Sequence, residues 1–314
     1  MKKKNFFKKL HLGVFVLSFF LVPSFSSAQR EIFKVGEISF FSSCILDKDN
    51  YLIVGDLGRI YKTENGGKKW SRISSSVTST LYSISQAGKE TLLVSGAEGL
   101  ILKSVDGGKS WQRKSTGTKR SLFSISFYDE FRGIVVGDWG TILYTEDGGE
   151  TWKDVSWKED IILYDVCFAD RENVWIVGEL GTLLQSNNGG KNWKTYPSPV
   201  QSTLTSIDFN DRSKGIFVGI DGMIFETQNS GRDWHRLSGF PTVHFYGVAF
   251  KDSIALCVGD YSTIFYRDSK NWTKLEVPSY LSTFWLSGVS VKKFNDQVLT
   301  LIAGKKGIII LDKK

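Results

Sequence analysis

The segment TEDGGETW, residues 145–152, concentrates carboxylates, glycines and a tryptophan in a short stretch of chain. Carboxylate oxygens bind hard cations such as Ca²⁺, and a pair of carboxylic acids carries out glycoside hydrolysis. An aspartate followed by glycines also favours a tight turn, because its side chain accepts nearby backbone N–H groups and glycine adopts positive φ. The segment therefore fits three interpretations: a metal loop, an acid/base pair or a structural turn.

Recurrence of this octet decides between the three interpretations. Five copies, spaced 41 residues apart, end at Trp70, Trp111, Trp152, Trp193 and Trp234. The third position of these copies is Asn65, Asp106, Asp147, Asn188 and Asn229. An amide replaces the carboxylate in three of the five copies, and an amide serves a turn but not acid catalysis. We interpret the octet as a structural turn whose tryptophan covers the gap between neighbouring repeats.

Two aspartates break the repeat where other copies carry small residues. Asp165 stands in a column of serine and glycine, and Asp208 stands in a column of cysteine, serine and alanine. Both fall in the first strand expected of their repeats. We hypothesise that they bind an ion, water or glycan in a central channel, or act as an acid pair. The alternative is that they are hydrogen-bonded structural residues in a wetted channel lining.

A second departure lies in loops of the third and fourth repeats, on the face opposite the octet turns. It consists of Lys119, Arg120, Trp139, Trp157 and Lys158. Tryptophan and arginine are enriched in interface hot spots, so we predict that these residues bind a partner. The alternative is a set of ordinary loop tryptophans folded onto the sheet edges. His244 lacks neighbours at ligand spacing, so we predict no metal site and no cofactor.

The elements that position these residues are short β-strands. In the third repeat, residues 122–127, 132–137, 140–145 and 151–156 are rich in β-branched and aromatic residues and are bounded by Gly or Asp. A period of about 40 residues with four strands is typical of a propeller blade. We predict an all-β fold, a single seven-bladed β-propeller of four-stranded antiparallel blades over residues 29–314.

The two ends of the chain suggest how the ring closes. The last unit supplies three strands, and residues 30–35 precede the first full unit. Counted by the repeat, Ile32 falls in the column of the outer strand, with Ile73, Val155 and Leu237. We therefore expect the N-terminal strand to complete the last blade, which would remove an open sheet edge.

The N-terminus resembles a targeting segment. Lysines at positions 2, 3, 4, 8 and 9 precede an apolar run over residues 10–22 and the small residues 26–28. This pattern predicts a secretory signal peptide over residues 1–28, cleaved after Ala28, and a periplasmic or secreted protein. Loss of those five lysines lowers the formal net charge from +7 to +2, so nothing favours a nucleic-acid partner. The three cysteines fall in separate repeats, and we expect them to be small buried residues without a disulfide.

The octets resemble the Asp-box of the bacterial neuraminidase repeat, and the whole unit is similar to photosystem II stability/assembly factor propellers. The resemblance covers essentially all of the chain after residue 28. It implies a non-enzymatic factor that holds partner proteins during assembly of a membrane complex, with an arginine-rich binding patch. Arg72, Arg113 and Arg236 recur two residues after the octet tryptophan, with Lys274 in the degenerate copy. The alternative interpretation is a charged outer edge that discourages sheet pairing.

Three functions follow from these patterns. We favour an exported, monomeric, non-catalytic scaffold that binds a protein partner such as a membrane-complex subunit. The first alternative is a sialidase-like glycoside hydrolase, which needs three converging arginines; Arg120 is the only good candidate near an inner strand. The second alternative is a propeller that binds a glycan or an ion without turnover.

Overall fold

The computed structural model describes residues 28–268 and 271–313. Residues 1–27, 269–270 and 314 lie outside this description, and so does nearly all of the predicted signal peptide, including the residues that lead to the cleavage point. Within the described ranges, no helix has the length and apolar character needed to cross a membrane.

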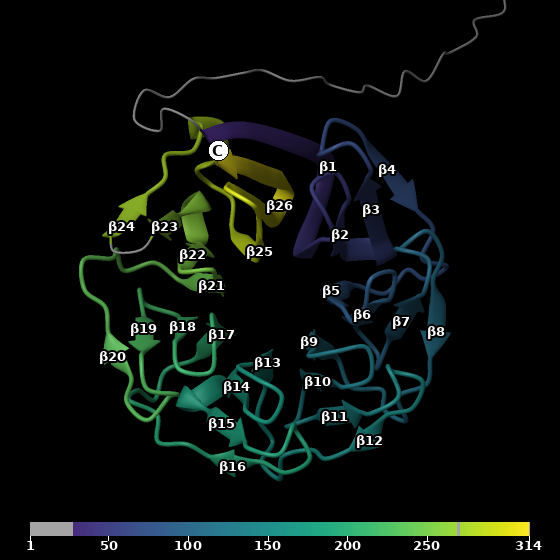
Figure 1. Cartoon of the computed structure of the whole chain (residues 1–314), viewed down its shortest axis with the longest axis vertical. Coiled ribbons are helices and arrows are strands. Elements are labelled where there is room, and N and C mark those ends of the chain that lie inside the picture. Colours follow the sequence, from purple (N-terminus) through teal and green to yellow (C-terminus); the bar gives the residue numbers. More distant parts are fainter. Residues whose placement is uncertain (1–27, 269–270, 314) are drawn as a thin grey trace, which may run out of the picture.

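The strands form a ring of sheets around a common axis (Figure 1). Five sheets have four strands each, in the orders β5-β6-β7-β8, β12-β11-β10-β9, β13-β14-β15-β16, β17-β18-β19-β20 and β21-β22-β23-β24. The first two comprise β5 (Leu81–Gln86), β6 (Leu92–Gly96), β7 (Ile101–Ser104), β8 (Gln112–Lys114), β9 (Leu122–Phe127), β10 (Gly133–Gly137), β11 (Ile142–Thr145) and β12 (Lys153–Asp154). The other three comprise β13 (Leu163–Phe168), β14 (Val174–Gly178), β15 (Leu183–Ser186), β16 (Lys194–Thr195), β17 (Leu204–Phe209), β18 (Gly215–Gly219), β19 (Ile224–Thr227), β20 (His235–Arg236), β21 (Phe245–Lys251), β22 (Ile254–Gly259), β23 (Ile264–Asp268) and β24 (Asn271–Lys274).

The prediction of seven separate four-stranded blades, with residues 30–35 completing the last one, is wrong. The described strands form six sheets, and the remaining sheet has six strands in the order β25-β26-β1-β2-β3-β4. These are β25 (Leu286–Phe294), β26 (Gln297–Lys313), β1 (Ala28–Ile45), β2 (Tyr51–Gly55), β3 (Arg59–Thr63) and β4 (Trp70–Ile73).

One long strand accounts for this difference. β1 pairs with β26 from Ala28 to Lys34 and, after a register shift, with β2 from Phe40 to Ile45. Because the first part of β1 pairs with β26 and its last part pairs with β2, the last and first strands of the chain share one sheet. The sequence period counts two units at this place, but it carries no information about which backbone groups pair.

The core lies between neighbouring sheets, because successive side chains of a strand point to opposite faces. All five residues of β10 are buried. Ile134 and Val136 pack with Leu163 of the following sheet, whereas Val135 packs with Leu93 of the preceding sheet. The second strands of the sheets are therefore mostly apolar and buried, as expected for strands covered on both faces.

The octet forms a hydrogen-bonded turn with the same geometry in Asp and Asn copies. The hydroxyl of Thr145 accepts the N–H of Gly149 at 3.0 Å. Oδ1 of Asp147 accepts the N–H of Thr151 at 2.9 Å, and Oδ1 of Asn188 accepts the equivalent N–H at 3.0 Å. Only one side-chain oxygen is needed for this bond, which explains why an amide replaces the carboxylate.

The octet tryptophans pack against the sheet that precedes their own in the chain. Trp111 belongs to a cluster with Leu52, and Trp193 packs against the cluster that contains Ile134. Each turn therefore joins two sheets.

The cysteines are small buried residues, as the sequence predicts. Cys44, Cys167 and Cys257 are buried and form no disulfide. Burial raises the pKa of the Cys44 thiol to about 12, so this thiol stays protonated and unreactive at neutral pH.

Candidate functional site

The turn between the second and third strands of a sheet has an unusual backbone. Between β10 and β11, Trp139 has a φ of 56° and Gly140 a φ of 64°. Two successive left-handed residues favour Asn, Asp or Gly at the first position, not a bulky side chain. The N–H of Thr141 donates to the carbonyl of Asp138, and the N–H of Asp138 donates to the carbonyl of Ser121, both at 3.0 Å. The turn is thereby tied to the loop that leads into β9.

The same turn recurs around the ring and presents bulky apolar residues to solvent. Left-handed φ values occur at Leu57, Glu98, Trp139, Leu180, Asp221 and Tyr261. Four of these are large and highly exposed: Leu57 at 58%, Trp139 at 60%, Leu180 at 75% and Tyr261 at 68%. We call these four residues the turn ring. Bulky residues in the left-handed region are outliers that suggest a functional constraint, and exposed apolar surface adds nothing to folding.

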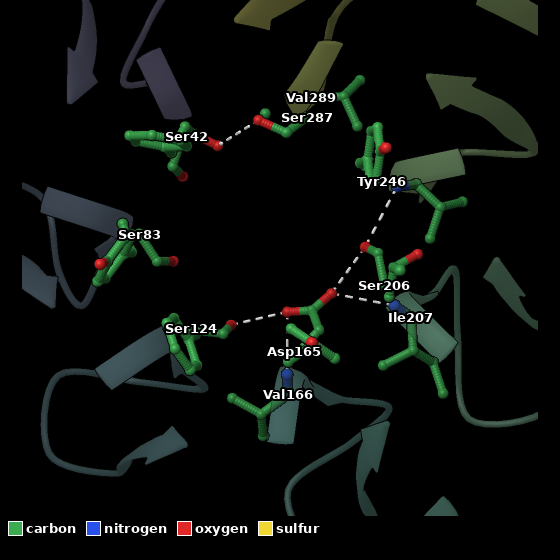
Figure 2. Close-up of a pocket in the computed structure, with 18 of the residues that line it drawn as sticks. Ser42, Ser83, Ser124, Asp165, Val166, Ser206, Ile207, Tyr246, Ser287 and Val289 are labelled. Carbon is green, nitrogen blue, oxygen red and sulfur yellow. Dashed lines mark hydrogen bonds between the residues drawn. The ribbon is translucent and has the colours of Figure 1, made fainter. Parts of the chain in front are cut away.

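A central cavity of about 570 Å³ is lined by residues of β1, β5, β9, β13, β17, β21 and β25. Figure 2 shows Ser42, Ser83, Ser124, Asp165 and Ser206 arranged around it. Small side chains at these positions leave the channel open along the ring axis. This volume is within the range of small-molecule and peptide side-chain sites.

Asp165 links three neighbouring sheets at the wall of this channel. Its Oδ1 accepts the hydroxyl of Ser124 at 2.7 Å and the N–H of Val166 at 2.9 Å. Its Oδ2 accepts the hydroxyl of Ser206 at 2.7 Å and the N–H of Ile207 at 3.0 Å. Burial raises the pKa of this carboxyl, and the four hydrogen bonds oppose that shift. Both oxygens are therefore engaged by protein donors (Figure 2).

Asp208 makes a similar link one sheet further on. Its Oδ2 accepts the N–H of Phe250 at 2.7 Å, and its Oδ1 accepts the N–H of Phe209 at 2.9 Å and the thiol of Cys167 at 3.2 Å. Lys251 Nζ lies 3.6 Å from Oδ1, and the charge of Asp208 raises the pKa of Lys251. The two aspartates thus bind different sets of donors and share none of them.

The structure brings together only part of the predicted partner patch. The guanidinium of Arg120 lies 5.4 Å from the ring centre of Trp139 and donates to its carbonyl oxygen at 3.2 Å. Trp157 is half-buried and packs against the core cluster between two sheets. Lys119, which precedes Arg120 in the chain, and Lys158 are exposed.

The recurring arginines are exposed on outer strands of the ring. Arg72 lies on β4, Arg113 on β8 and Arg236 on β20. Figure 1 shows β4 and β8 in neighbouring sheets and β20 on the other side of the ring. These three side chains therefore do not form one patch.

Sequence reasoning singled out Trp139 but missed the rest of the turn ring. Leu57, Trp139 and Leu180 fall in one column of the 41-residue repeat, so a signal was present. The column also holds Glu98 and Asp221, and without the backbone angles nothing marks its apolar members as exposed.

The described residues contain no group of three or more His, Cys, Asp or Glu side chains placed to hold a metal ion.

A protein-family model matches the sequence. The sequence model described as "Photosynthesis system II assembly factor YCF48" matches residues 34–121, 114–197 and 152–239. These segments together span more than half of the chain. A comparison with curated protein sequences gives no significant match.

Several solved structures share the fold. YCF48 bound to a D1 peptide has a TM-score of 0.71 at 17% identity, over 90% of this chain and 94% of that one. YCF48 from Cyanidioschyzon merolae has a TM-score of 0.70 at 19% identity, over 90% and 98%. The GH74 xyloglucanase from Xanthomonas campestris has a TM-score of 0.70 at 13% identity, over 90% of this chain but 53% of that enzyme.

Proposed function

The chain belongs to the family of the photosynthesis system II assembly factor YCF48, and from this premise we propose that it is a non-catalytic scaffold for assembly of a membrane complex. It acts by holding a protein partner against the face that carries the turn ring. The similar structure of YCF48 with a D1 peptide supports a protein partner for this chain as well.

The turn ring is the observation that carries this proposal. Leu57, Trp139, Leu180 and Tyr261 are each more than half exposed and sit at positive φ. A left-handed conformation costs a bulky L-residue about 1–2 kcal/mol, and exposed apolar groups on one face are typical of interaction sites. Retaining both features at four turns is best explained if a partner covers these side chains.

Asparagine substitutions test the proposal without threatening the fold. Asn is well tolerated at positive φ, so a variant with Leu57→Asn, Trp139→Asn, Leu180→Asn and Tyr261→Asn should be at least as stable as the wild type. We expect proteins cross-linked to the wild type in membrane extracts of the source organism to be lost with this variant. The control is Val105→Asn with Phe131→Asn, which removes similarly exposed apolar residues, at 67% and 60%, from the octet-turn and first-to-second-strand loops. Equal capture by wild type and turn-ring variant would exclude this face.

A D1 peptide is a defined probe for the identity of the complex. Titration calorimetry with the wild type would detect binding, and the turn-ring variant would show whether this face is used. Binding would indicate photosystem II as the target; capture of other membrane proteins without D1 binding would indicate a different complex.

We propose that the protein works outside the cytoplasm. The five N-terminal lysines, the apolar run over residues 10–22 and the small residues 26–28 support export. N-terminal sequencing of the protein from its source should find Gln29 as the first residue. A cytoplasmic protein that begins at Met1 would contradict this.

The scaffold proposal includes the absence of glycoside turnover. A glycosidase needs two carboxyl groups free to reach the substrate, whereas Asp165 and Asp208 are each engaged by donors from neighbouring sheets. A panel of glycosides incubated with the wild type should release no sugar. Release that disappears in Asp165→Asn would establish a hydrolase instead.

A further inference from the structure

Four carboxylates stand at the mouth of the channel, one residue before the turn ring: Asp56, Asp138, Glu179 and Asp260. All four are half-buried. The N–H of Asp138, of Glu179 and of Asp260 each donates at 3.0 Å to the loop that enters the neighbouring inner strand.

Ile220 occupies the equivalent turn position in another repeat and shows that this position faces the central cavity. It makes the same backbone bond, to Thr203 at 3.2 Å, and both Ile220 and Thr203 line the central cavity. The four carboxylates occupy the equivalent place in their own repeats, and each helps to raise the pKa of a tyrosine that lines the cavity. Asp56 and Asp138 act on Tyr82, Glu179 acts on Tyr164, and Asp260 acts on Tyr246.

These carboxylates lack cationic partners. In residues 28–268 and 271–313, none of the four takes part in a salt bridge within 4.0 Å. The equivalent position of the last unit holds Lys305, whose N–H donates to Trp285 at 3.0 Å. The mouth thus carries four acidic groups and one basic group at equivalent positions. Like charges held together without counter-ions favour a cationic ligand.

Aromatic rings line the same mouth in an unbroken arc, which we call the aromatic arc: Phe41, Tyr82, Phe123 and Tyr164. Successive ring centres are 5.8, 5.1 and 6.1 Å apart, and all four residues line the cavity. Partial burial raises the pKa of Tyr82, and the charges of Asp138 and Asp56 raise it further. Asp56 and Asp138 therefore act electrostatically on a ring of the aromatic arc.

We propose that the channel mouth receives a lysine or arginine side chain from the protein partner. The aliphatic stem and cation pack on the aromatic arc through apolar and cation–π contact, and Asp56 and Asp138 neutralise the charge. A neutral glycan would also stack on aromatic rings, but it would leave the carboxylates unneutralised. This inference rests on the proposed scaffold function and specifies the chemistry of the partner segment.

A random decapeptide library displayed on phage, selected on the full chain, tests the inference. We expect Lys and Arg to be enriched several-fold over Asp and Glu in peptides recovered with the wild type. The Asp56→Asn/Asp138→Asn variant should lose this enrichment. The Glu98→Gln/Asp221→Asn variant, which removes the same charge from the left-handed turn positions of two other repeats, should keep it.

A second measurement identifies the interacting group. A recovered peptide and its version with arginine replaced by neutral citrulline are compared by fluorescence anisotropy. We expect citrulline to weaken binding about tenfold to the wild type and to have little effect with Asp56→Asn/Asp138→Asn.

Several results would overturn the inference. They are recovery of no peptides, recovery without basic enrichment, or enrichment that survives Asp56→Asn/Asp138→Asn. A further contradicting result is binding to a glycan array that Asp56→Asn/Asp138→Asn abolishes, together with no preference among peptides. The ligand of the channel mouth would then be a sugar and not a basic side chain. None of these results alters cross-linking by the turn ring, so failure here is distinguishable from failure of the scaffold proposal.

Discussion

At the scale of single residues, the octet shows how a carboxylate serves structure without catalysis. Asp147 and Asn188 accept equivalent backbone N–H groups at 2.9 and 3.0 Å. Each supplies an oxygen to a turn that must reverse the chain within a few residues. This backbone hydrogen bond needs a side-chain acceptor oxygen, which the carboxylate and the amide both supply.

Two substitutions of Asp147 separate the effect of its acceptor oxygen from the effect of its negative charge. Asp147→Ala removes the acceptor and should lower the free energy of unfolding by about 1 kcal/mol or more, whereas Asp147→Asn keeps an acceptor oxygen and should lose clearly less at pH 7. Urea unfolding monitored by tryptophan fluorescence measures both. If Asp147→Asn is as destabilised as Asp147→Ala, the charge is required and the turn interpretation fails.

The same residue predicts a pH dependence. Burial opposes ionisation of Asp147, but hydrogen bonds from Thr151 and Thr145 outweigh it and lower the pKa to about 2. An unfolded Asp titrates near about 3.9, so its contribution to stability is complete above that pH and disappears as the pH falls through about 2. Wild type should lose stability relative to Asp147→Asn between about pH 4 and pH 2. A difference in the free energy of unfolding between the two proteins that stays constant from about pH 4 to pH 2 would contradict the assignment.

At the scale of elements, neighbouring sheets are joined by contacts that recur with the repeat. The N–H of Phe127 donates to the hydroxyl of Ser85 at 3.1 Å, as the N–H of Ile207 does to Asp165. The glycine at the fifth position of the octet adds a close steric contact to these bonds in four of the five copies, Gly108, Gly149, Gly190 and Gly231. A Cβ on Gly149 would lie 2.4 Å from a methyl carbon of Leu93 in the preceding sheet.

Gly149→Ala tests this steric contact, and Gly117→Ala is its control. Both glycines have positive φ, 83° and 73°, so alanine costs about 1 kcal/mol at either. No atom lies within 4 Å of a Cβ built on Gly117, whereas overpacking against Leu93 should cost about 1–3 kcal/mol more. Thermal unfolding should rank the proteins wild type, Gly117→Ala, Gly149→Ala. Equal losses of stability for the two variants would show that the neighbouring sheets can move apart to make room for a methyl group at Gly149.

At the scale of the whole molecule, the six-stranded sheet joins the two ends of the chain. The pairing of β1 with β26 runs from Ala28–Lys313 to Lys34–Gly307. Phe33 stacks on Trp70 with ring centres 5.4 Å apart and packs against buried Ile308 and Ile310. Without this pairing β26 would present an apolar edge to solvent, which promotes aggregation.

Removal of residues 1–35 should therefore destabilise the whole ring. We expect a loss of about 3 kcal/mol or more, comparable to deletion of a buried aromatic side chain, with aggregation visible by size-exclusion chromatography. A chain that begins at Ala28 is the control and should behave as the full chain. Equal stability of the two shortened chains would show that this pairing is dispensable.

Local chemistry made part of this protein predictable. The 41-residue spacing of Trp70 to Trp234 and the exchange of Asp for Asn identify a propeller turn, because turn geometry depends on neighbours within a few residues. The same reasoning marked Trp139, whose large side chain stands out in a loop. It missed Leu180 and Tyr261, because exposure depends on what the rest of the chain leaves uncovered.

The order of amino acids alone establishes the repeat, the all-β class and the structural role of the octet. These properties follow from hydrogen bonds and side-chain alternation between residues that are close in the sequence, and the same pattern recurs in each repeat. Only the folded ring decides that β1 merges the last and first strands into one sheet, and that Asp165 and Asp208 tie sheets together. It also decides that Asp56 and Asp138, which form no salt bridge within the described part of the chain, lie close enough to Tyr82 of the aromatic arc to raise its pKa. Most of those outcomes depend on contacts between residues 40 or more positions apart, where periodicity shows which positions are equivalent but not which ones touch.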